Sequence, residues 1–251
     1  VHSHAPMTLL RGYAENLPLQ RWLGEKVFPF EDQIDDEAAY YGTLLAISEM
    51  LASGTASFSD MYLFFGGMVP AILESGIKCN LSRGLTVFDD SDYTDLPAYR
   101  DNVRLRGEWN GANNGRLIGD LCIHGEYTSN PKIVEAVAQH ARETGARIQI
   151  HLSETQTEHE ECKGRHGLTP AAYMEKHGIF DSPTTAAHCV WLEDEDFDIL
   201  KKHNVSVACC PASNLKLASG YANIPKMLEK GINIALGTDG AASNNNLNIL
   251  Q

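Results

Sequence analysis

Short apolar runs rich in β-branched residues alternate with helical patterns along the whole chain. Tyr40, Leu44, Ile47 and Leu51 recur at helical spacing, and Gly54 follows them as a C-terminal cap. A repeated order of strand, loop and helix favours parallel pairing, because parallel strands need a long crossover between them. The predicted strands cover residues 1–4, 55–61, 78–85, 116–124, 147–153, 184–190, 205–210 and 233–238.

Cap residues mark the helices between these strands. Asn130 and Pro131 are typical of the first positions of a helix, and that helix ends at Gly145. Gly76 and Gly231 end two other helices in the same way. Eight strand–helix units with apolar strands predict an α/β fold of the closed (β/α)8, TIM-barrel type. An open doubly wound sheet is disfavoured, since the sequence has no GxGxxG turn.

Composition excludes several classes of partner. The net charge of −13 would repel a phosphate backbone, and no apolar run approaches the roughly 18 residues that cross a bilayer. We therefore expect neither nucleic acid nor a membrane as a partner. The six cysteines form no CxxC pair, which suits a reducing cytoplasm. The sequence leaves open whether the protein forms a homo-oligomer.

Histidines and one aspartate stand where the predicted strands end, which is where barrels of this type place their active sites. His2 and His4 point to the same face of their strand, because side chains alternate along a strand. His151 and Asp239 follow two other strands. Three imidazoles and a carboxylate predict a site for one divalent metal ion, Zn²⁺ first, with Fe²⁺ and Mn²⁺ as alternatives.

Two further residues near these strand ends are candidates for catalysis. Glu154 lies just beyond its strand, where it could move protons without binding the metal. The alternative interpretation of Glu154 is a loop glutamate that is solvated at the mouth of the barrel. His188 follows small residues that leave room for a ring to reach water at the metal, and its alternative is a buried histidine bonded to backbone. Glu158 is expected to face solvent.

With these residues placed, the chain resembles the amidohydrolase superfamily, in particular its branch of methylthioadenosine/S-adenosylhomocysteine deaminases. The resemblance spans essentially the whole chain. The segments that carry it are His2-Ser3-His4-Ala5-Pro6-Met7-Thr8-Leu9-Leu10-Arg11-Gly12, Ser59-Asp60-Met61-Tyr62, His151-Leu152-Ser153-Glu154-Thr155, Ala187-His188-Cys189, Pro211-Ala212-Ser213-Asn214-Leu215-Lys216-Leu217 and Gly237-Thr238-Asp239-Gly240-Ala241-Ala242-Ser243-Asn244.

The resemblance implies roles for individual residues. His2, His4, His151 and Asp239 would bind one metal ion. Catalysis would fall to Glu154, His188 and Asp239, with His188 steadying the hydroxide. Contacts to a purine nucleoside would come from Trp22, Glu31, Arg83, His124, Glu154 and Ser243. Residues 1–251 would form one barrel, truncated at both ends relative to the family, whose members carry a small β-sandwich that is absent here.

The expected reaction is hydrolytic deamination of 5′-methylthioadenosine, adenosine or S-adenosylhomocysteine to the inosine analogue and ammonia. The closest enzymatic alternative is a hydrolase of cyclic amides, which in this superfamily resembles a two-metal design bridged by a modified lysine at the end of the fourth strand. Residues 116–124 contain no lysine, which disfavours this alternative. Other amino-heterocycles, namely guanine, a triazine or a pterin, remain alternatives. The alternative of another class is a non-catalytic or truncated metal-binding barrel.

Acidic side chains near the expected mouth of the pocket affect which 5′ substituent of the nucleoside is preferred. Relatives usually have proline where this chain has Glu126, and the loop after the third strand is acidic. These carboxylates would repel the carboxylate of a homocysteine tail. We therefore expect adenosine or methylthioadenosine to be preferred. The acidic loop residues are Asp89, Asp90, Asp92 and Asp95.

Overall fold

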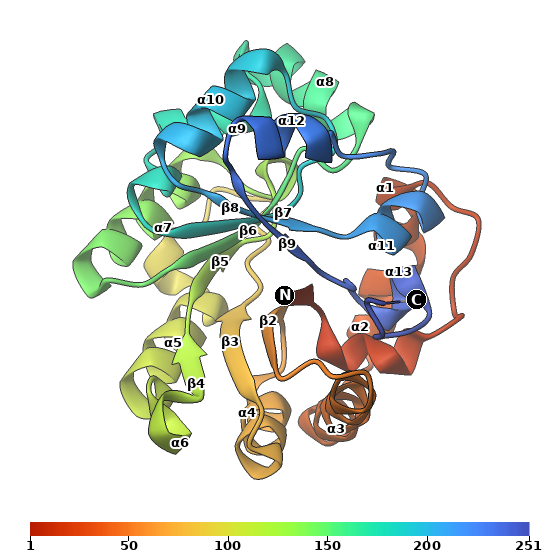
Figure 1. Ribbon diagram of the computed structural model, residues 1–251. Coiled ribbons are helices and arrows are strands. Elements are labelled where there is room, and N and C mark those ends of the chain that lie inside the picture. The colour runs from red at the N-terminus through yellow and green to blue at the C-terminus, as the bar shows by residue number, and fades with distance from the viewer. Residues whose placement is uncertain (251) are drawn as a thin grey trace.

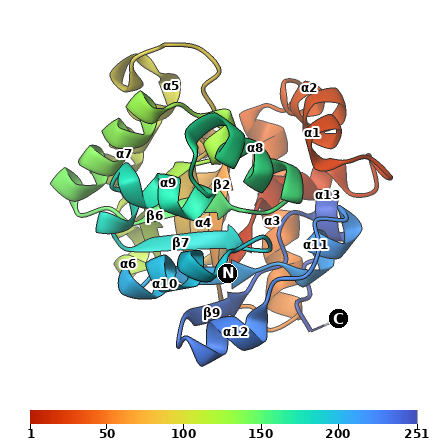
Figure 2. The same cartoon turned by 90° about the horizontal axis from the view of Figure 1, so that it is seen from above.

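A computed structural model describes residues 1–250, and its parallel strands form a barrel surrounded by helices (Figures 1 and 2). The strands form two runs, β1-β2-β3-β4 and β5-β6-β7-β8-β9, and within each run every strand pairs in parallel with the next strand in the chain. The strands are β1 (His2–Ser3), β2 (Ser57–Tyr62), β3 (Lys78–Arg83), β4 (Leu117–Gly119), β5 (Leu121–Ile123), β6 (Ile148–Leu152), β7 (Thr184–His188), β8 (Ser206–Cys209) and β9 (Asn233–Leu236).

The ring closes where the last strand meets the first. The amino group of Val1 donates to the carbonyl oxygen of Leu236 at 2.6 Å, and the amide of Asp239 donates to the carbonyl oxygen of His2 at 3.1 Å. These bonds place the end of β9 beside β1, so the first and last strands share one rim of the barrel. The predicted (β/α)8 fold is confirmed.

One predicted strand, 116–124, differs from expectation because it divides at Asp120 into β4 and β5. The amide of Asp120 still bonds to Leu81 of β3, whereas the next amide, that of Leu121, bonds to Arg147 beside β6. The buried Asp120 carboxylate accepts hydrogen bonds from the side chains of Arg147 and Gln149. The predicted fourth strand therefore pairs with β3 before Asp120 and with β6 after it, and so joins the two halves of the barrel.

The helices begin and end largely where the cap residues predict. Asn130 accepts a hydrogen bond from the amide of Ile133, and Gly145 ends the same helix with a φ of 64°. The last helix ends at Asn244. The helices are α1 (Leu19–Trp22), α2 (Phe28–Glu31), α3 (Asp36–Ala52), α4 (Phe65–Ser75), α5 (Pro97–Arg104), α6 (Ala112–Gly115), α7 (Pro131–Thr144), α8 (Gln156–His166), α9 (Pro170–Lys176), α10 (Asp194–Lys202), α11 (Pro211–Lys216), α12 (Ile224–Glu229) and α13 (Ala241–Asn244).

The hydrophobic core lies in two parts, one on each side of the barrel. Ile123, Ile150 and Val137 belong to the part between β5, β6 and α7, and Leu81 and Met68 to the part between β3 and α4. Strands covered on both faces must be apolar on both faces, which explains the unbroken apolar runs in the sequence. Among residues 1–250, the helices are too short or too polar to span a bilayer.

Candidate active site

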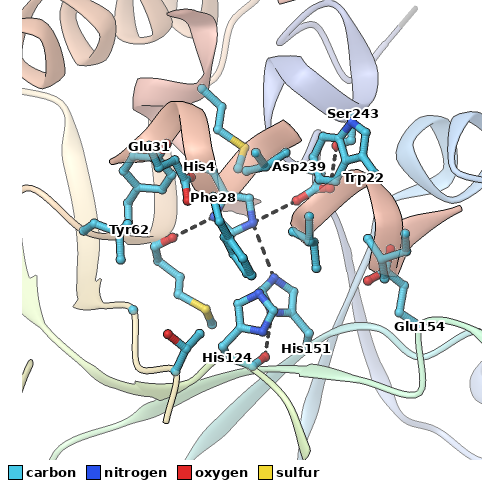
Figure 3. A pocket seen from close by; sticks show the side chains of 18 of the residues that line it. His4, Trp22, Phe28, Glu31, Tyr62, His124, His151, Glu154, Asp239 and Ser243 are labelled. Carbon is cyan, nitrogen blue, oxygen red and sulfur yellow. Dashed lines mark hydrogen bonds and ion pairs between the residues drawn. The ribbon is translucent and has the colours of Figure 1, made fainter. Parts of the chain in front are cut away.

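Five residues from distant parts of the chain converge at the carboxyl-terminal ends of the strands. His2 lies on β1, His151 on β6 and His188 at the end of β7, while His4 and Asp239 follow β1 and β9. Figure 3 shows His4 and His151 facing each other, with Asp239 beside His4. Two overlapping groups have ligand atoms within 4.8 Å of one another, His2 with His151 and His188, and His2 with His4 and Asp239.

Three separations between these atoms match those around one tetrahedral metal ion. Asp239 Oδ1 lies 3.2 Å from His2 Nε2 and 3.2 Å from His4 Nε2, and His4 Nε2 lies 3.4 Å from His151 Nε2. Atoms that surround Zn²⁺ at its usual bond lengths lie about 3.3–3.4 Å apart. The residues present therefore suit a cation of that size.

Backbone carbonyls fix the orientation of two of the rings. His4 Nδ1 donates to the carbonyl oxygen of Met61 at 2.7 Å, and His151 Nδ1 donates to that of His124 at 2.6 Å. A carbonyl can only accept, so each Nδ1 carries a proton, and Nε2 is the nitrogen that faces the common point. This arrangement is typical of histidines that bind metals.

The two carboxylate oxygens of Asp239 have different surroundings, because one is hydrogen-bonded to serine hydroxyls and the other faces the histidines. Oδ2 accepts hydrogen bonds from the hydroxyls of Ser213 and Ser243, both at 2.7 Å. Oδ1 is buried and, among the described residues, makes no hydrogen bond, and the same holds for His2 Nε2. The two atoms lie 3.2 Å apart without hydrogen-bond geometry. Buried polar atoms normally have a partner, and a cation bound between these two atoms would supply one.

Burial and charge set the protonation of the cluster. Burial lowers the pKa of His2 to about 4 and that of His124 to about 3, so both rings are neutral at neutral pH. Burial also disfavours a charged His4, but the close contact with the Asp239 carboxylate and its charge outweigh burial and raise the pKa of His4 to about 9. Close contacts with the rings of His2 and His4, together with the charges of His4 and His188, overcome the effect of burial on Asp239 and hold its pKa well below the usual range.

Asp60 supports the histidine motif, and the sequence analysis did not single it out. Its Oδ2 accepts hydrogen bonds from the hydroxyl of Ser3 at 2.9 Å and from the amide of Ala5 at 2.7 Å, on either side of His4. Asp60 is fully buried on β2, next to β1. A charged residue inside an otherwise buried strand was the signal in the sequence that could have indicated this role.

Glu154 and His188 lie together at one side of the cluster. Glu154 Oε2 is 3.8 Å from His188 Nε2, and Glu154 Oε1 accepts a hydrogen bond from Ser219 at 3.4 Å. His188 Nδ1 donates to the side-chain oxygen of Asn214 at 2.9 Å, which directs Nε2 toward the cluster. Burial raises the pKa of Glu154, and the charges of Glu154 and Asp239 raise that of His188 against the effect of burial. Both alternatives, a solvated glutamate and a backbone-bonded histidine, are therefore wrong.

A cavity of about 280 Å³ opens onto the cluster and contains most of the predicted substrate contacts. In Figure 3, Glu31 and Tyr62 lie on one side of His4 and His151, and Glu154 lies on the other. The residues that line the cavity are His4, Met7, Leu19, Trp22, Leu23, Val27, Phe28, Glu31, Asp32, Met61, Tyr62, Leu63, Gly84, Thr86, Phe88, His124, Tyr127, His151, Glu154, His188, Leu217, Asp239 and Ser243.

Arg83 and Glu126 lie outside the cavity lining. Arg83 Nε pairs with Asp101 at 3.1 Å, and its Nη1 donates to the carbonyl oxygen of Gly84 at 2.7 Å. Glu126 is 2% exposed and accepts hydrogen bonds from Arg165 at 2.6 Å and His166 at 2.8 Å. The expectation that Glu126 repels a substrate tail at the mouth is therefore wrong. A contact between Arg83 and substrate stays a prediction.

Comparisons with known proteins agree with this geometry. The chain is 45% identical over 249 residues to the 5-methylthioadenosine/S-adenosylhomocysteine deaminase of Moorella thermoacetica. It is 46% identical over 250 residues to the protein of the same name in Dictyoglomus thermophilum. The matches cover 99% and 100% of this chain but 58% of each relative, so the chain spans little more than half the length of those proteins.

A solved structure of a deaminase is also similar to this chain. The zinc-bound crystal structure of an adenosine deaminase from Xanthomonas campestris superposes with a TM-score of 0.89 at 31% sequence identity, over 98% of this chain and 56% of that chain. The model of the amidohydrolase family matches residues 1–251. This chain therefore belongs to the amidohydrolase family.

Proposed function

We propose that this chain is the catalytic barrel of a hydrolytic deaminase of adenosine-type purines such as 5′-methylthioadenosine. The observation that carries the proposal is the convergence of three imidazole nitrogens and one carboxylate oxygen at the spacing of a tetrahedral metal site. Relatives at 45–46% identity with deaminase names support the reaction class. We further propose that residues 1–251 form one domain, with the small β-sandwich of the family outside it.

The metal site is proposed to consist of His2, His4, His151 and Asp239, with zinc first among the candidates because the Xanthomonas campestris enzyme was solved with zinc. A bound divalent cation supplies Lewis acidity, which makes water a nucleophile near neutral pH. The neutral rings of His2 and His151 suit this role, and His4, whose pKa is about 9 without a metal, would release a proton when the metal binds.

Glu154 and His188 perform the proton chemistry in this proposal. The carboxyl group of Glu154 gives a proton to the ring nitrogen of the purine while water adds to C6, and His188 Nε2 stabilises the adduct. Asp239 takes one proton from the attacking water and passes it to the amino group, so that the C6–N bond breaks and ammonia leaves. The hydroxyl proton of the adduct passes to Glu154 as the C6 carbonyl forms. The raised pKa of buried Glu154 suits a group that must both hold and release a proton.

Substrate contacts are assigned to residues that line the cavity around this centre. Glu31 lies beside Tyr62 on the wall away from Glu154, and its proposed role is to accept hydrogen bonds from ribose hydroxyls. Trp22 offers an apolar surface for packing, while His124 and Ser243 lie near the cluster where the base would bind. Guanine, triazine and pterin substrates are the alternatives within the same chemistry, and a metal-binding barrel without activity is the alternative outside it.

A panel of substrates tests the proposal on the full-length protein. Adenosine, 5′-methylthioadenosine, S-adenosylhomocysteine, guanine and cytosine are each supplied to the metal-loaded enzyme, and ammonia release is measured. We expect turnover of the adenosine nucleosides and loss of turnover after chelation. Turnover of guanine alone would move the assignment to another heterocycle, and bound metal without ammonia release would favour the non-catalytic barrel.

Among these nucleosides we predict a preference for a neutral 5′ group. Among the described residues, no lysine or arginine lines the cavity, whereas Glu31 and Asp32 do, and apolar Leu63 and Phe88 line it too. A homocysteine carboxylate would therefore lose water without gaining a cationic partner. We expect kcat/KM for methylthioadenosine to exceed that for S-adenosylhomocysteine by about tenfold, the worth of one charged hydrogen bond.

Arg83 allows this prediction to be tested by substitution. Asp101→Asn removes the charged partner that holds the Arg83 guanidinium. The released guanidinium would become a cationic partner for the homocysteine carboxylate, so the ratio of kcat/KM for methylthioadenosine to that for S-adenosylhomocysteine should fall toward one. Glu108→Gln is the matched control, because Glu108 pairs at 3.1 Å with Arg104 of the same segment on the surface. A higher kcat/KM for S-adenosylhomocysteine in the wild-type enzyme would refute the predicted preference.

A further inference from the structure

Glu158 is a buried carboxylate that binds the backbone at the tip of β6. It is 1% exposed, although the sequence analysis expected it in solvent. Its Oε1 accepts a hydrogen bond from the amide of Ser153 at 2.9 Å, and its Oε2 accepts one from the amide of Glu154 at 2.7 Å. Ser153 has a φ of 47°, so two successive amides point to the same side and form an anion-binding concavity.

Helix capping alone does not account for this contact. Thr155 is the N-cap of α8, and its hydroxyl accepts a hydrogen bond from the amide of Glu158 at 3.1 Å. In an ordinary capping box the glutamate would reach back to the amide of the N-cap residue itself. Here the carboxylate reaches past Thr155 to Ser153 and Glu154, so it binds the segment that carries a proposed catalytic residue.

The opposite side of the same segment is bound as well. The carbonyl oxygen of Ser153 accepts hydrogen bonds from the amides of Val190 at 3.0 Å and Trp191 at 2.9 Å. These amides belong to the turn after β7, which also carries His188. The backbone of residues 153–154 is thus held between the first turn of α8 and the loop beside His188.

We propose that Glu158 is a positioning residue that holds the carboxyl group of Glu154 in place against His188 and the metal centre. The proposal rests on the proposed function, because it assumes that Glu154 moves protons. Glu158 is not itself catalytic, since it does not line the cavity and both of its oxygens are bound by backbone amides. Without it, the Ser153–Glu154 amides would have to seek water, and the left-handed residue Ser153 could relax.

Three variants separate positioning from capping. Glu158→Gln keeps the size of the side chain but replaces one accepting oxygen with an NH2 group that cannot accept. Glu158→Ala removes both acceptors. Thr155→Ala is the matched control, because it removes the other half of the cap of α8 and leaves the hydrogen bonds of residues 153–154 intact. All three are made in the full-length protein, and metal content, thermal unfolding, kcat and KM are measured.

If Glu158 positions Glu154, kcat falls about 10-fold in Glu158→Gln and about 100-fold in Glu158→Ala, as expected when a reacting group is misplaced. KM and metal content should stay within about twofold of wild type, since binding does not use the Glu154 proton. Amide exchange at Ser153 and Glu154 should accelerate in both variants. Thr155→Ala should lower the unfolding temperature but leave kcat and these two amides unchanged.

Two results would overturn the positioning role. One is an unchanged kcat in Glu158→Gln, a test that holds even if Glu158→Ala does not fold. The other is a loss of kcat in Thr155→Ala as large as that in the Glu158 variants, which would reduce Glu158 to a cap. Failure of the proposed function looks different, because the wild-type enzyme itself would then release no ammonia from any nucleoside on the panel.

Discussion

Replacing Asp239 with alanine is expected to abolish metal binding and to lower kcat by at least about 1000-fold, which corresponds to about 4 kcal/mol of transition-state stabilisation. Asp239 supplies the only carboxylate in the group it forms with His2 and His4. Its Oδ1 is 3.2 Å from the Nε2 atoms of both rings, so its removal leaves a neutral nitrogen set with no charge to offset that of the cation.

Metal content per chain, measured by elemental analysis after gel filtration, is the direct readout, and turnover of methylthioadenosine is the second. Ser213→Ala is the matched control, because it removes one of the two hydrogen bonds to Oδ2 and leaves Oδ1 in place. That control should retain metal and lose about tenfold or more in affinity, the usual effect of losing a hydrogen bond to a ligand. An Asp239→Ala protein that still binds one metal ion per chain as tightly as wild type would contradict the proposed centre.

Those parts of the site that depend on local periodicity could be predicted from the sequence. His2 and His4 share a face because side chains alternate along any strand. His151 and Asp239 follow separate strands, and in a parallel barrel all such ends lie on one rim. Caps were equally local, as Asn130 and Gly145 show. None of these inferences required knowledge of which side chains meet across the structure.

The features that the sequence analysis missed all depend on contacts between distant segments. Glu126 is neutralised by Arg165, which is 39 residues away, and Arg83 is held by Asp101 on α5. The division of the fourth strand at Asp120 arises because its neighbours β3 and β6 compete for its backbone. Glu158 looked like a solvated helical residue because its partners are backbone amides, which leave no mark in a sequence.

Replacing Glu154 with glutamine should separate metal binding from catalysis. The amide keeps the size of the side chain, but it cannot give a proton to a purine nitrogen and recover it. Glu154 is not among the residues grouped as metal ligands, and its nearest charged neighbour is His188 at 3.8 Å. Metal content should therefore be unchanged, while kcat falls about 100- to 10,000-fold, the usual contribution of a general acid or base.

A matched control is available on α8, the helix that follows Glu154. Glu160 is exposed on α8, so Glu160→Gln makes the same chemical change without touching the cavity, and it should keep the kcat of wild type. KM for methylthioadenosine should change only a few-fold in Glu154→Gln, because the ring nitrogen is bound before the proton moves. If Glu154→Gln binds metal and turns over at the wild-type rate, proton transfer must belong to another group, and His188, with its raised pKa, would be the next residue to replace.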